Sequence, residues 1–297
     1  MIEKSPIEKQ SSGTAMATAF MRALAAHDSR KEIRGHDYLA EIFLEEEQKK
    51  PLNDPAIRAW VMKNKIAPGA YEFMIARTAF FDEILEQALR ENIGQVVILG
   101  AGYDSRPYRF GEFIQDTQIF ELDSEPTQTR KKECLLQAGI LISKQIKFVP
   151  VNFEIDNLKD ALIAAEYSPV KKTLFIWEGV TYYLSSEVVD KMLTFVKLNS
   201  PSSSAIGFDY ASLSEEALNE KGVKELRKLM QSQHAGEPTR FGIRAGRIGA
   251  YLKERGFAVR KHLTAVDMGE IYLTTGGNLK AGKVPSLFCL VYATVMD

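Results

Sequence analysis

The spacing of apolar residues divides the chain near residue 91. From residue 14 to residue 91, apolar side chains recur every three or four positions, and those from Phe80 to Leu89 would form one buried helical stripe. Beyond this point, short apolar runs alternate with amphipathic stretches such as residues 188–196. The runs are VVIL, QIFEL, IKFVPV, TLFIW and AIGFDY. This alternation predicts an α/β fold in which helices cover both faces of a parallel sheet.

The last third of the chain departs from this alternation. GFAVRKHLTA and SLFCLVYATVM predict two further strands, which we expect to end the sheet as an antiparallel pair. Between AIGFDY and these strands, residues 211–242 form a charged, helical insertion. The insertion would either cover a site at the strand ends or serve as an ordinary crossover helix with a solvated face. We expect one domain, with a helical part at 1–91 and an α/β core at 92–297.

Composition narrows the class of ligand. The 38 basic and 39 acidic residues give a formal net charge of −1, which provides no overall field to hold nucleic acid or an anionic membrane. A small-molecule ligand is therefore favoured. Cys134 and Cys289 lie far apart without a CxxC motif, so neither a disulfide framework nor a zinc site is predicted. The polar N-terminus and the absence of a long apolar run predict a soluble, cytoplasmic protein without an export signal.

Chemistry is expected where parallel strands end, because ligands of open α/β sheets bind at the carboxyl edge. The first predicted strand is followed by Gly100-Ala101-Gly102, which allows a tight turn and a close approach of the backbone to a ligand. A dinucleotide-binding turn would have glycine or alanine in place of Ser105. The turn alone is also consistent with a strand-to-helix connection that binds nothing.

Polar residues follow the next two strands. Asp123 stands 23 positions after Gly100, close to the spacing at which an acid accepts from both hydroxyls of a ribose. Glu121 lies two residues before Asp123 on the same strand face. It would either belong to the same site or form an ion pair with a lysine such as Lys131. Asn152 and Phe153 follow the third strand, where an amide and an aromatic ring would suit an adenine.

Two further charges stand out. Glu178 directly follows the apolar strand TLFIW. A carboxylate in that position needs a cationic partner, either from the ligand or from a basic side chain. Arg77 lies on the helix that carries the Phe80 to Leu89 stripe, and its guanidinium could hold a ligand carboxylate through two hydrogen bonds. An ion pair of Arg77 with Glu72 or Asp82 on the helix surface is the alternative.

Several ordered blocks together resemble the leucine carboxyl methyltransferase family, in its bacterial branch of S-adenosylmethionine-dependent O-methyltransferases that includes the tetracenomycin type. The blocks are TAMATAFMRALAAHD, ARTAFFDE, VVILGAGYDSRPYR, FELDSEPTQTRKK, FVPVNFE, FIWEGVTYYLS and GEPTRFGI. The resemblance covers most of the chain. It implies a Rossmann-like class I methyltransferase fold with a mostly parallel seven-stranded sheet, an antiparallel C-terminal strand, N-terminal helices and a helical cover.

The resemblance also implies roles for the residues at the strand ends. Arg77 would hold the methionyl carboxylate of the cofactor, and Glu178 would lie near its ammonium or the adjacent turn. The turn from Gly100 through Ala101 to Gly102 would lie beneath the methionine part, and Asp123 would accept the ribose hydroxyls. Asn152 and Phe153 would contact the adenine. The family usually has aspartate followed by leucine at these last two positions, so the hydrogen bonds to adenine would differ here.

The methyl acceptor is less defined. A carboxylate acceptor needs no base, whereas a phenol or alcohol benefits from one, and the candidates are Tyr183 and His234, with Tyr182 beside them. We expect a small-molecule acceptor, with a protein C-terminal carboxylate as the other possibility, and no metal, nucleic acid or membrane partner. A nicotinamide-dependent oxidoreductase is the first alternative, although no Tyr-x-x-x-Lys motif is recognisable. A non-catalytic S-adenosylmethionine-binding protein is the second.

Overall fold

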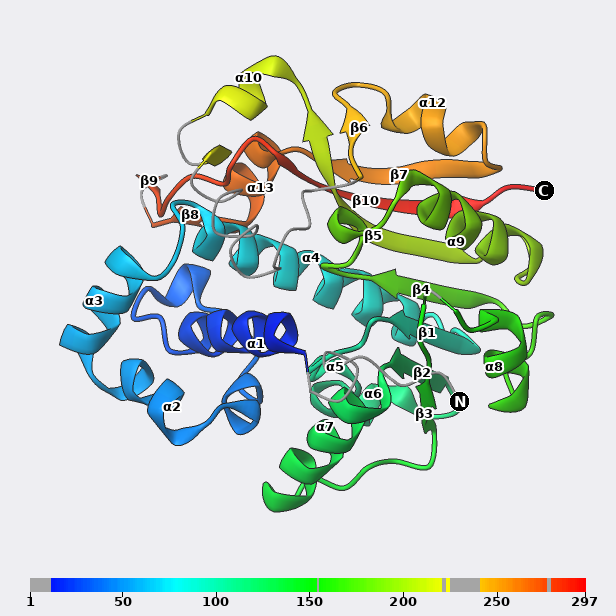
Figure 1. Cartoon of the computed structure of the whole chain (residues 1–297), viewed down its shortest axis with the longest axis horizontal. Coiled ribbons are helices and arrows are strands. Elements are labelled where there is room, and N and C mark those ends of the chain that lie inside the picture. Colours follow the sequence, from blue (N-terminus) through cyan, green and yellow to red (C-terminus); the bar gives the residue numbers. More distant parts are fainter. Residues whose placement is uncertain (1–11, 154, 221–222, 225–240, 277–278) are drawn as a thin grey trace.

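A mostly parallel sheet with helices on both faces forms the centre of the computed structural model (Figure 1). The structure describes residues 12–153, 155–220, 223–224, 241–276 and 279–297. The strand order is β3-β2-β1-β4-β5-β10-β7, and the short β6 pairs with β5 outside this path. The bounds are β1 Gln95–Leu99, β2 Gln118–Asp123, β3 Ile146–Pro150, β4 Thr173–Trp177, β5 Ala205–Leu213, β6 Ile243–Arg244, β7 Phe257–Leu263 and β10 Phe288–Val295.

Each apolar run of the sequence became a strand, so the predicted α/β fold is confirmed. Strands β1 to β5 pair in parallel, whereas β10 runs antiparallel to both β5 and β7. The two C-terminal strands thus end the sheet as an antiparallel pair, as predicted. The wholly buried β1 and β4 explain why their sequences are continuous apolar runs rather than alternating ones.

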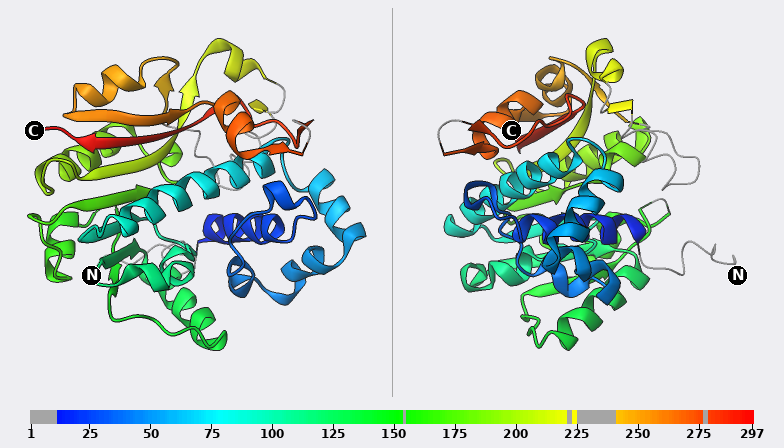
Figure 2. Two further views of the ribbon diagram at one scale, coloured as in Figure 1. Left: turned by 180° about the vertical axis from the view of Figure 1, so that it is seen from behind. Right: turned by 90° about the vertical axis from the view of Figure 1, so that its left-hand side faces the viewer.

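Helices dominate the part before β1, and no strand occurs among its described residues. Ser12 caps α1 by accepting from the N–H of Ala15, and Asp54 caps α3 in the same way. The elements of this part are α1 Gly13–Ala26, η2 Lys31–Ile33, η3 Ala40–Phe43, α2 Glu46–Asn53, α3 Pro55–Asn64 and α4 Ala70–Arg90. Two further views show α1, α2 and α3 gathered beside the beginning of α4 (Figure 2).

Two apolar cores lie on the two faces of the sheet. On one face α4 buries Phe80, Phe81, Ile84 and Leu85, which is the stripe predicted from the sequence. On the other face α8, α9 and α12 pack their apolar sides against the sheet. The remaining elements are α5 Arg106–Arg109, α6 Gly111–Ile114, α7 Glu125–Gln137, α8 Leu158–Ala164, η4 Thr181–Tyr183, α9 Ser186–Leu198, α10 Glu215–Asn219, α12 Ile248–Lys253, α13 Ala265–Tyr272, β8 Thr274–Thr275 and β9 Leu279–Lys280.

The predicted insertion at 211–242 begins later than expected, because β5 continues to Leu213. Its first helix is α10, and residues 225–240, with His234 among them, lie outside the described residues. Within the described part of the chain, no helix has both the length and the apolar character needed to cross a membrane.

Candidate active site

The glycine turn after β1 lies tightly packed between the N-terminal helices and the segment that follows β4. Gly100 and Gly102 adopt φ angles of +71° and +47°, which residues with a Cβ rarely do. A Cβ on Gly100 would lie 2.7 Å from Cγ2 of Val180, and one on Gly102 would lie 3.0 Å from the Cβ of Ala15. The glycines are therefore required by the backbone conformation and by the close packing together.

This packing predicts the cost of a single methyl group. Gly100→Ala is expected to lower the free energy of unfolding by about 1–2 kcal/mol from the left-handed conformation alone, with the contact to branched Val180 adding to it. Urea denaturation measures this. The matched control is Gly111→Ala in α6, where a Cβ would meet nothing within 4 Å and φ is not positive. Equal stability of the two variants would contradict the explanation.

Asp123 lies beside this turn at the end of β2. Its Oδ2 accepts a hydrogen bond from the backbone N–H of Gly102 at 2.7 Å, and its Oδ1 accepts one from Ser124 at 2.7 Å. Burial raises the pKa of the Asp123 carboxyl, and the two backbone hydrogen bonds partly offset that rise. The acid predicted to contact a ribose is thus joined to the glycine turn by a direct hydrogen bond.

Asn152 and Phe153 follow β3, the strand next to β2. The backbone N–H of Val151 donates to the carbonyl of Asp123 at 2.9 Å, which keeps the two strand ends side by side. The N–H of Asn152 donates to Asp156 at 2.7 Å, and the ring of Phe153 packs against the core on the α8 face. Both residues therefore stand at the same sheet edge as Asp123.

Arg77 and Glu178 face each other across the end of β4. Arg77 Nε lies 2.9 Å from Glu178 Oε1, and Arg77 Nη1 donates to Asp209 Oδ2 at 3.1 Å. Although both are buried, Arg77 Nε and Glu178 Oε1 make no hydrogen bond within the described residues. Arg77 thus pairs with Glu178 and Asp209, and the alternative pairing with Glu72 or Asp82 is wrong.

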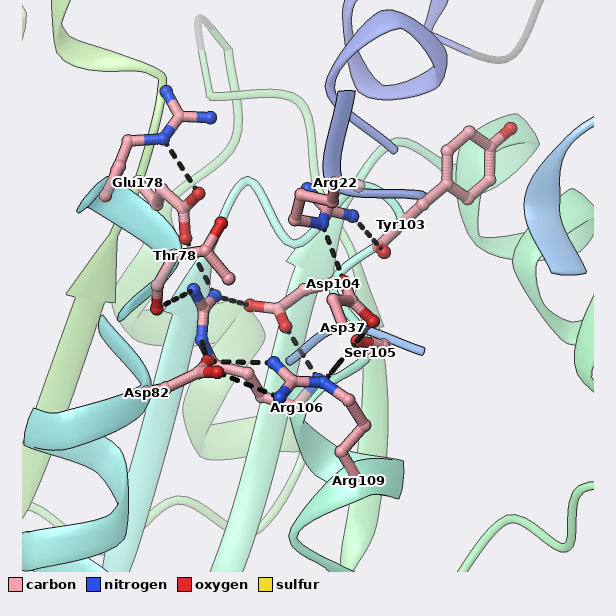
Figure 3. A network of polar contacts seen from close by, with 12 residues as sticks. Arg22, Asp37, Thr78, Asp82, Tyr103, Asp104, Ser105, Arg106, Arg109 and Glu178 are labelled. Atoms are coloured by element: carbon pink, nitrogen blue, oxygen red, sulfur yellow. Dashed lines mark hydrogen bonds and ion pairs between the residues drawn. The ribbon is translucent and has the colours of Figure 1, made fainter. Parts of the chain in front are cut away.

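Glu178 is held from a second side by Arg106. The Arg106 side chain is 3% exposed, and its Nη1 donates to Glu178 Oε2 at 2.7 Å (Figure 3). The same guanidinium donates to Asp104 and to Asp82, each at 2.8 Å. Burial raises the pKa of Glu178, but Arg106 and Arg77 more than offset this and hold that pKa below its usual value.

The ion pairs continue into the N-terminal helices. Arg109 contacts Asp82 at 2.8 Å and Asp37 at 3.3 Å, and Arg22 donates to Asp37 at 2.8 Å. Arg22 also donates to the backbone carbonyl of Tyr103 at 2.7 Å (Figure 3). We call the whole set the arginine network. Its members are Arg22, Asp37, Arg77, Asp82, Asp104, Arg106, Arg109, Glu178 and Asp209.

The partners of these charges were not predictable residue by residue. Arg106 and Arg109, which follow the glycine turn, pair with acids of the arginine network and not with Glu121. Glu121 instead binds Lys131 at 2.6 Å and accepts from Tyr108 at 3.1 Å, which fits the lysine pairing that we also considered. Of these partners, Asp209 could have been recognised from the sequence as a buried charge that needs a cation, because it is a carboxylate inside the apolar run AIGFDY.

Of the predicted proton acceptors, the two tyrosines are within the described residues. Tyr183 is half-buried in η4, and burial raises the pKa of its hydroxyl to about 12. Tyr182 is buried, and burial together with the nearby Asp209 raises the pKa of its hydroxyl as well. Both phenols are therefore neutral near pH 7, which suits hydrogen bonding better than proton abstraction.

A separate hollow lies where α3 meets α4. Its volume is about 500 Å³, and residues between Met62 and Glu72 line it, including Lys63, Lys65 and Tyr71. None of these residues belongs to the arginine network. The strand ends, where acids, arginines and the glycine turn meet, remain the better candidate for the reacting centre, because the hollow is lined by one continuous segment of the chain.

Comparisons with known sequences agree with one another. The family model for leucine carboxyl methyltransferase matches residues 15–197. YktD of Bacillus subtilis (strain 168), provisionally named as an S-adenosyl-L-methionine-dependent methyltransferase, is 30% identical over 225 residues, which are 75% of this chain and 72% of YktD. A relative from Mycolicibacterium smegmatis with the same provisional name is 32% identical over 150 residues, and the match spans 50% of this chain and 46% of that relative.

Solved structures are similar over the whole chain. A provisionally named methyltransferase from Thermobifida fusca matches with a TM-score of 0.60 at 13% identity and covers 100% of both chains. A DUF574 family protein from Streptomyces avermitilis matches with a TM-score of 0.59 at 12% identity, over 97% of this chain and 99% of its own. At such identities the likeness concerns the fold.

Proposed function

This chain belongs to the leucine carboxyl methyltransferase family, and we propose that it transfers the methyl group of S-adenosylmethionine to a carboxylate or hydroxyl oxygen of a small molecule. Its relatives are named as S-adenosylmethionine-dependent methyltransferases, and the same cofactor and class of reaction hold for this chain. We propose the acceptor, the residues that act on it and the residues that hold the cofactor.

One observation carries the proposed cofactor site. Arg77 Nε and Glu178 Oε1 form a buried ion pair at 2.9 Å that lacks the geometry of a hydrogen bond, and neither atom has a hydrogen-bond partner within the described residues. An amino acid group carries the two charges that complement this pair, a carboxylate for the arginine and an ammonium for the glutamate. S-adenosylmethionine ends in such a group, so the residues fit it.

The remaining parts of the cofactor have matching neighbours at this edge. Asp123 offers a carboxylate for two ribose hydroxyls, and Gly100 and Gly102 allow the backbone to come close. Asn152 and Phe153 offer an amide and an aromatic ring for the adenine. The arginine network contains five carboxylates and four guanidiniums, and this excess of negative charge suits a cofactor with a net positive charge.

When bound, S-adenosylmethionine supplies a methyl group made electrophilic by the positively charged sulfur. The task of this chain is to hold the acceptor oxygen in line with that group and to exclude water. We assign Tyr183 to hydrogen bonding of the acceptor, because it interacts electrostatically with Arg77 and Asp209 at this edge and its phenol keeps its proton near pH 7. His234, which lies outside the described residues, remains a candidate to accept a proton from a hydroxyl acceptor.

Calorimetry with S-adenosylhomocysteine tests the cofactor site, and radiolabelled S-adenosylmethionine tests the acceptor. We expect binding, followed by methyl transfer to at least one member of a panel of small carboxylic acids and phenols. A peptide with a C-terminal leucine serves as the competing acceptor. Transfer to the peptide alone would overturn the small-molecule proposal, and NADH binding without S-adenosylhomocysteine binding would overturn the cofactor site.

Removal of the Asp123 carboxylate tests the placement of the ribose. We expect Asp123→Ala to weaken S-adenosylhomocysteine binding by about 1–3 kcal/mol, because the ribose hydroxyls lose their acceptor in a buried position. Asp123→Asn, which keeps an acceptor oxygen, should lose less. The matched control is Asp190→Ala on α9, whose carboxylate pairs with Arg255 away from the sheet edge. An unchanged affinity in Asp123→Ala would exclude this residue from the ribose site.

A further inference from the structure

Arg106 is the central member of the arginine network and touches three separate elements. Its Nε donates to Asp82 of α4, and its Nη1 donates both to Asp104 of the glycine turn and to Glu178 after β4 (Figure 3). The Asp104 carboxylate also accepts a hydrogen bond from the backbone N–H of Arg106 at 2.8 Å. One guanidinium therefore joins the helix that carries Arg77, the turn, and the acid that faces Arg77.

The two oxygens of Glu178 are divided between two arginines. Oε2 accepts from Arg106 at 2.7 Å, while Oε1 lies 2.9 Å from Arg77 and makes no hydrogen bond among the described residues. We propose that Arg106 is a positioning residue, which fixes Glu178 through Oε2 so that Oε1 is presented to the ammonium of S-adenosylmethionine. This inference rests on the proposed function, and it assigns Arg106 no contact with the cofactor.

Only an arginine meets this geometry. Asp82, Asp104 and Glu178 lie around the guanidinium in different directions, and its planar group with several donors can reach all three (Figure 3). A lysine at this position would keep the charge but present a single ammonium. Arg106→Lys therefore separates the effect of charge from the effect of geometry.

The charges around Glu178 predict a signature in the pH dependence of binding. Arg106 from α5, Arg77 from α4 and Arg22 from α1 lower the pKa of Glu178, whereas burial and Asp104 raise it. Asp209 of β5 faces Arg77 from the other side. Without the Arg106 charge, only Arg77 and Arg22 would oppose burial and Asp104, so the pKa of Glu178 should rise. The carboxylate would then take up a proton as the pH falls and would lose its attraction for the ammonium of the cofactor.

The experiment measures the affinity for S-adenosylhomocysteine by calorimetry between about pH 8 and pH 5.5, in the full-length protein. The wild type should bind with little change across this range. Arg106→Gln should bind more weakly and lose up to about tenfold in affinity for each pH unit below the raised pKa of Glu178. Arg106→Lys should lose affinity at every pH but restore a flatter profile, because the charge is kept.

Arg255→Lys is the matched control, since Arg255 also binds a carboxylate, that of Asp190, through two nitrogens but lies away from the sheet edge. It should match the wild type. Failure of the wild type to bind would overturn the proposed function itself. The positioning role would be overturned if the wild type binds and both Arg106 variants keep its affinity and its pH profile. Should Arg106→Gln not fold, by circular dichroism, then wild-type affinity in Arg106→Lys alone would overturn it.

Discussion

Arg77→Met is expected to weaken S-adenosylhomocysteine binding by about 2–5 kcal/mol, roughly 30-fold to 5,000-fold in Kd. Arg77 is buried, and its Nη2 contacts the sulfur of Met74, a weak acceptor, at 3.4 Å. Within the described part of the chain this is the only hydrogen bond of Nη2, so a ligand carboxylate would give this nitrogen a stronger partner. The substitution removes that interaction and also leaves Glu178 and Asp209 without the cation between them.

Arg77→Lys separates the loss of the ligand contact from the loss of the cation between Glu178 and Asp209. Lysine keeps a positive charge between the carboxylates but loses the planar guanidinium that binds a carboxylate through two nitrogens. We expect a folded protein with an intermediate loss of affinity, checked by thermal melting beside calorimetry. Binding at the wild-type level in a folded Arg77→Met would show that the cofactor carboxylate lies elsewhere.

The fold was predictable because its central strands are buried on both faces. Residues 96–99 and 173–177 are wholly buried, so their sequences are short apolar runs with clear ends. The stripe from Phe80 to Leu89 was equally clear, because a single helix face packs against the sheet. The insertion boundary was less certain, since β5 runs on to Leu213 through a sequence without a sharp change.

The polar side chains at the strand ends were also predictable, but not their partners. A residue that follows a parallel strand must lie at the carboxyl edge, and this brought Asp123 beside the glycine turn. The partner of a buried charge depends instead on tertiary packing. Arg106 meets Glu178 across 72 positions of the sequence, and Arg22 meets the carbonyl of Tyr103 across 81. Nothing in the type or spacing of these residues indicates such pairs.

Lys131→Met is expected to lower the free energy of unfolding by about 3–5 kcal/mol, the range for removing one partner of a buried ion pair. Lys131 and Glu121 are both fully buried, and Lys131 Nζ lies 2.6 Å from Glu121 Oε2. Burial raises the pKa of Glu121, and Lys131 opposes that rise. Without Lys131, the Glu121 carboxylate must either stay charged inside the core or take up a proton, with Tyr108 as its remaining donor.

The pH dependence of this loss identifies its cause. A carboxyl whose folded pKa is raised above its unfolded value destabilises the fold at pH values above both and ceases to do so as it becomes protonated. The deficit of Lys131→Met, measured by urea denaturation, should therefore be largest near pH 8 and shrink towards about pH 5. The double variant Glu121→Leu/Lys131→Met, which removes both charges, should recover most of the stability. A deficit that stays the same at both pH values and in the double variant would instead indicate lost packing of the lysine side chain.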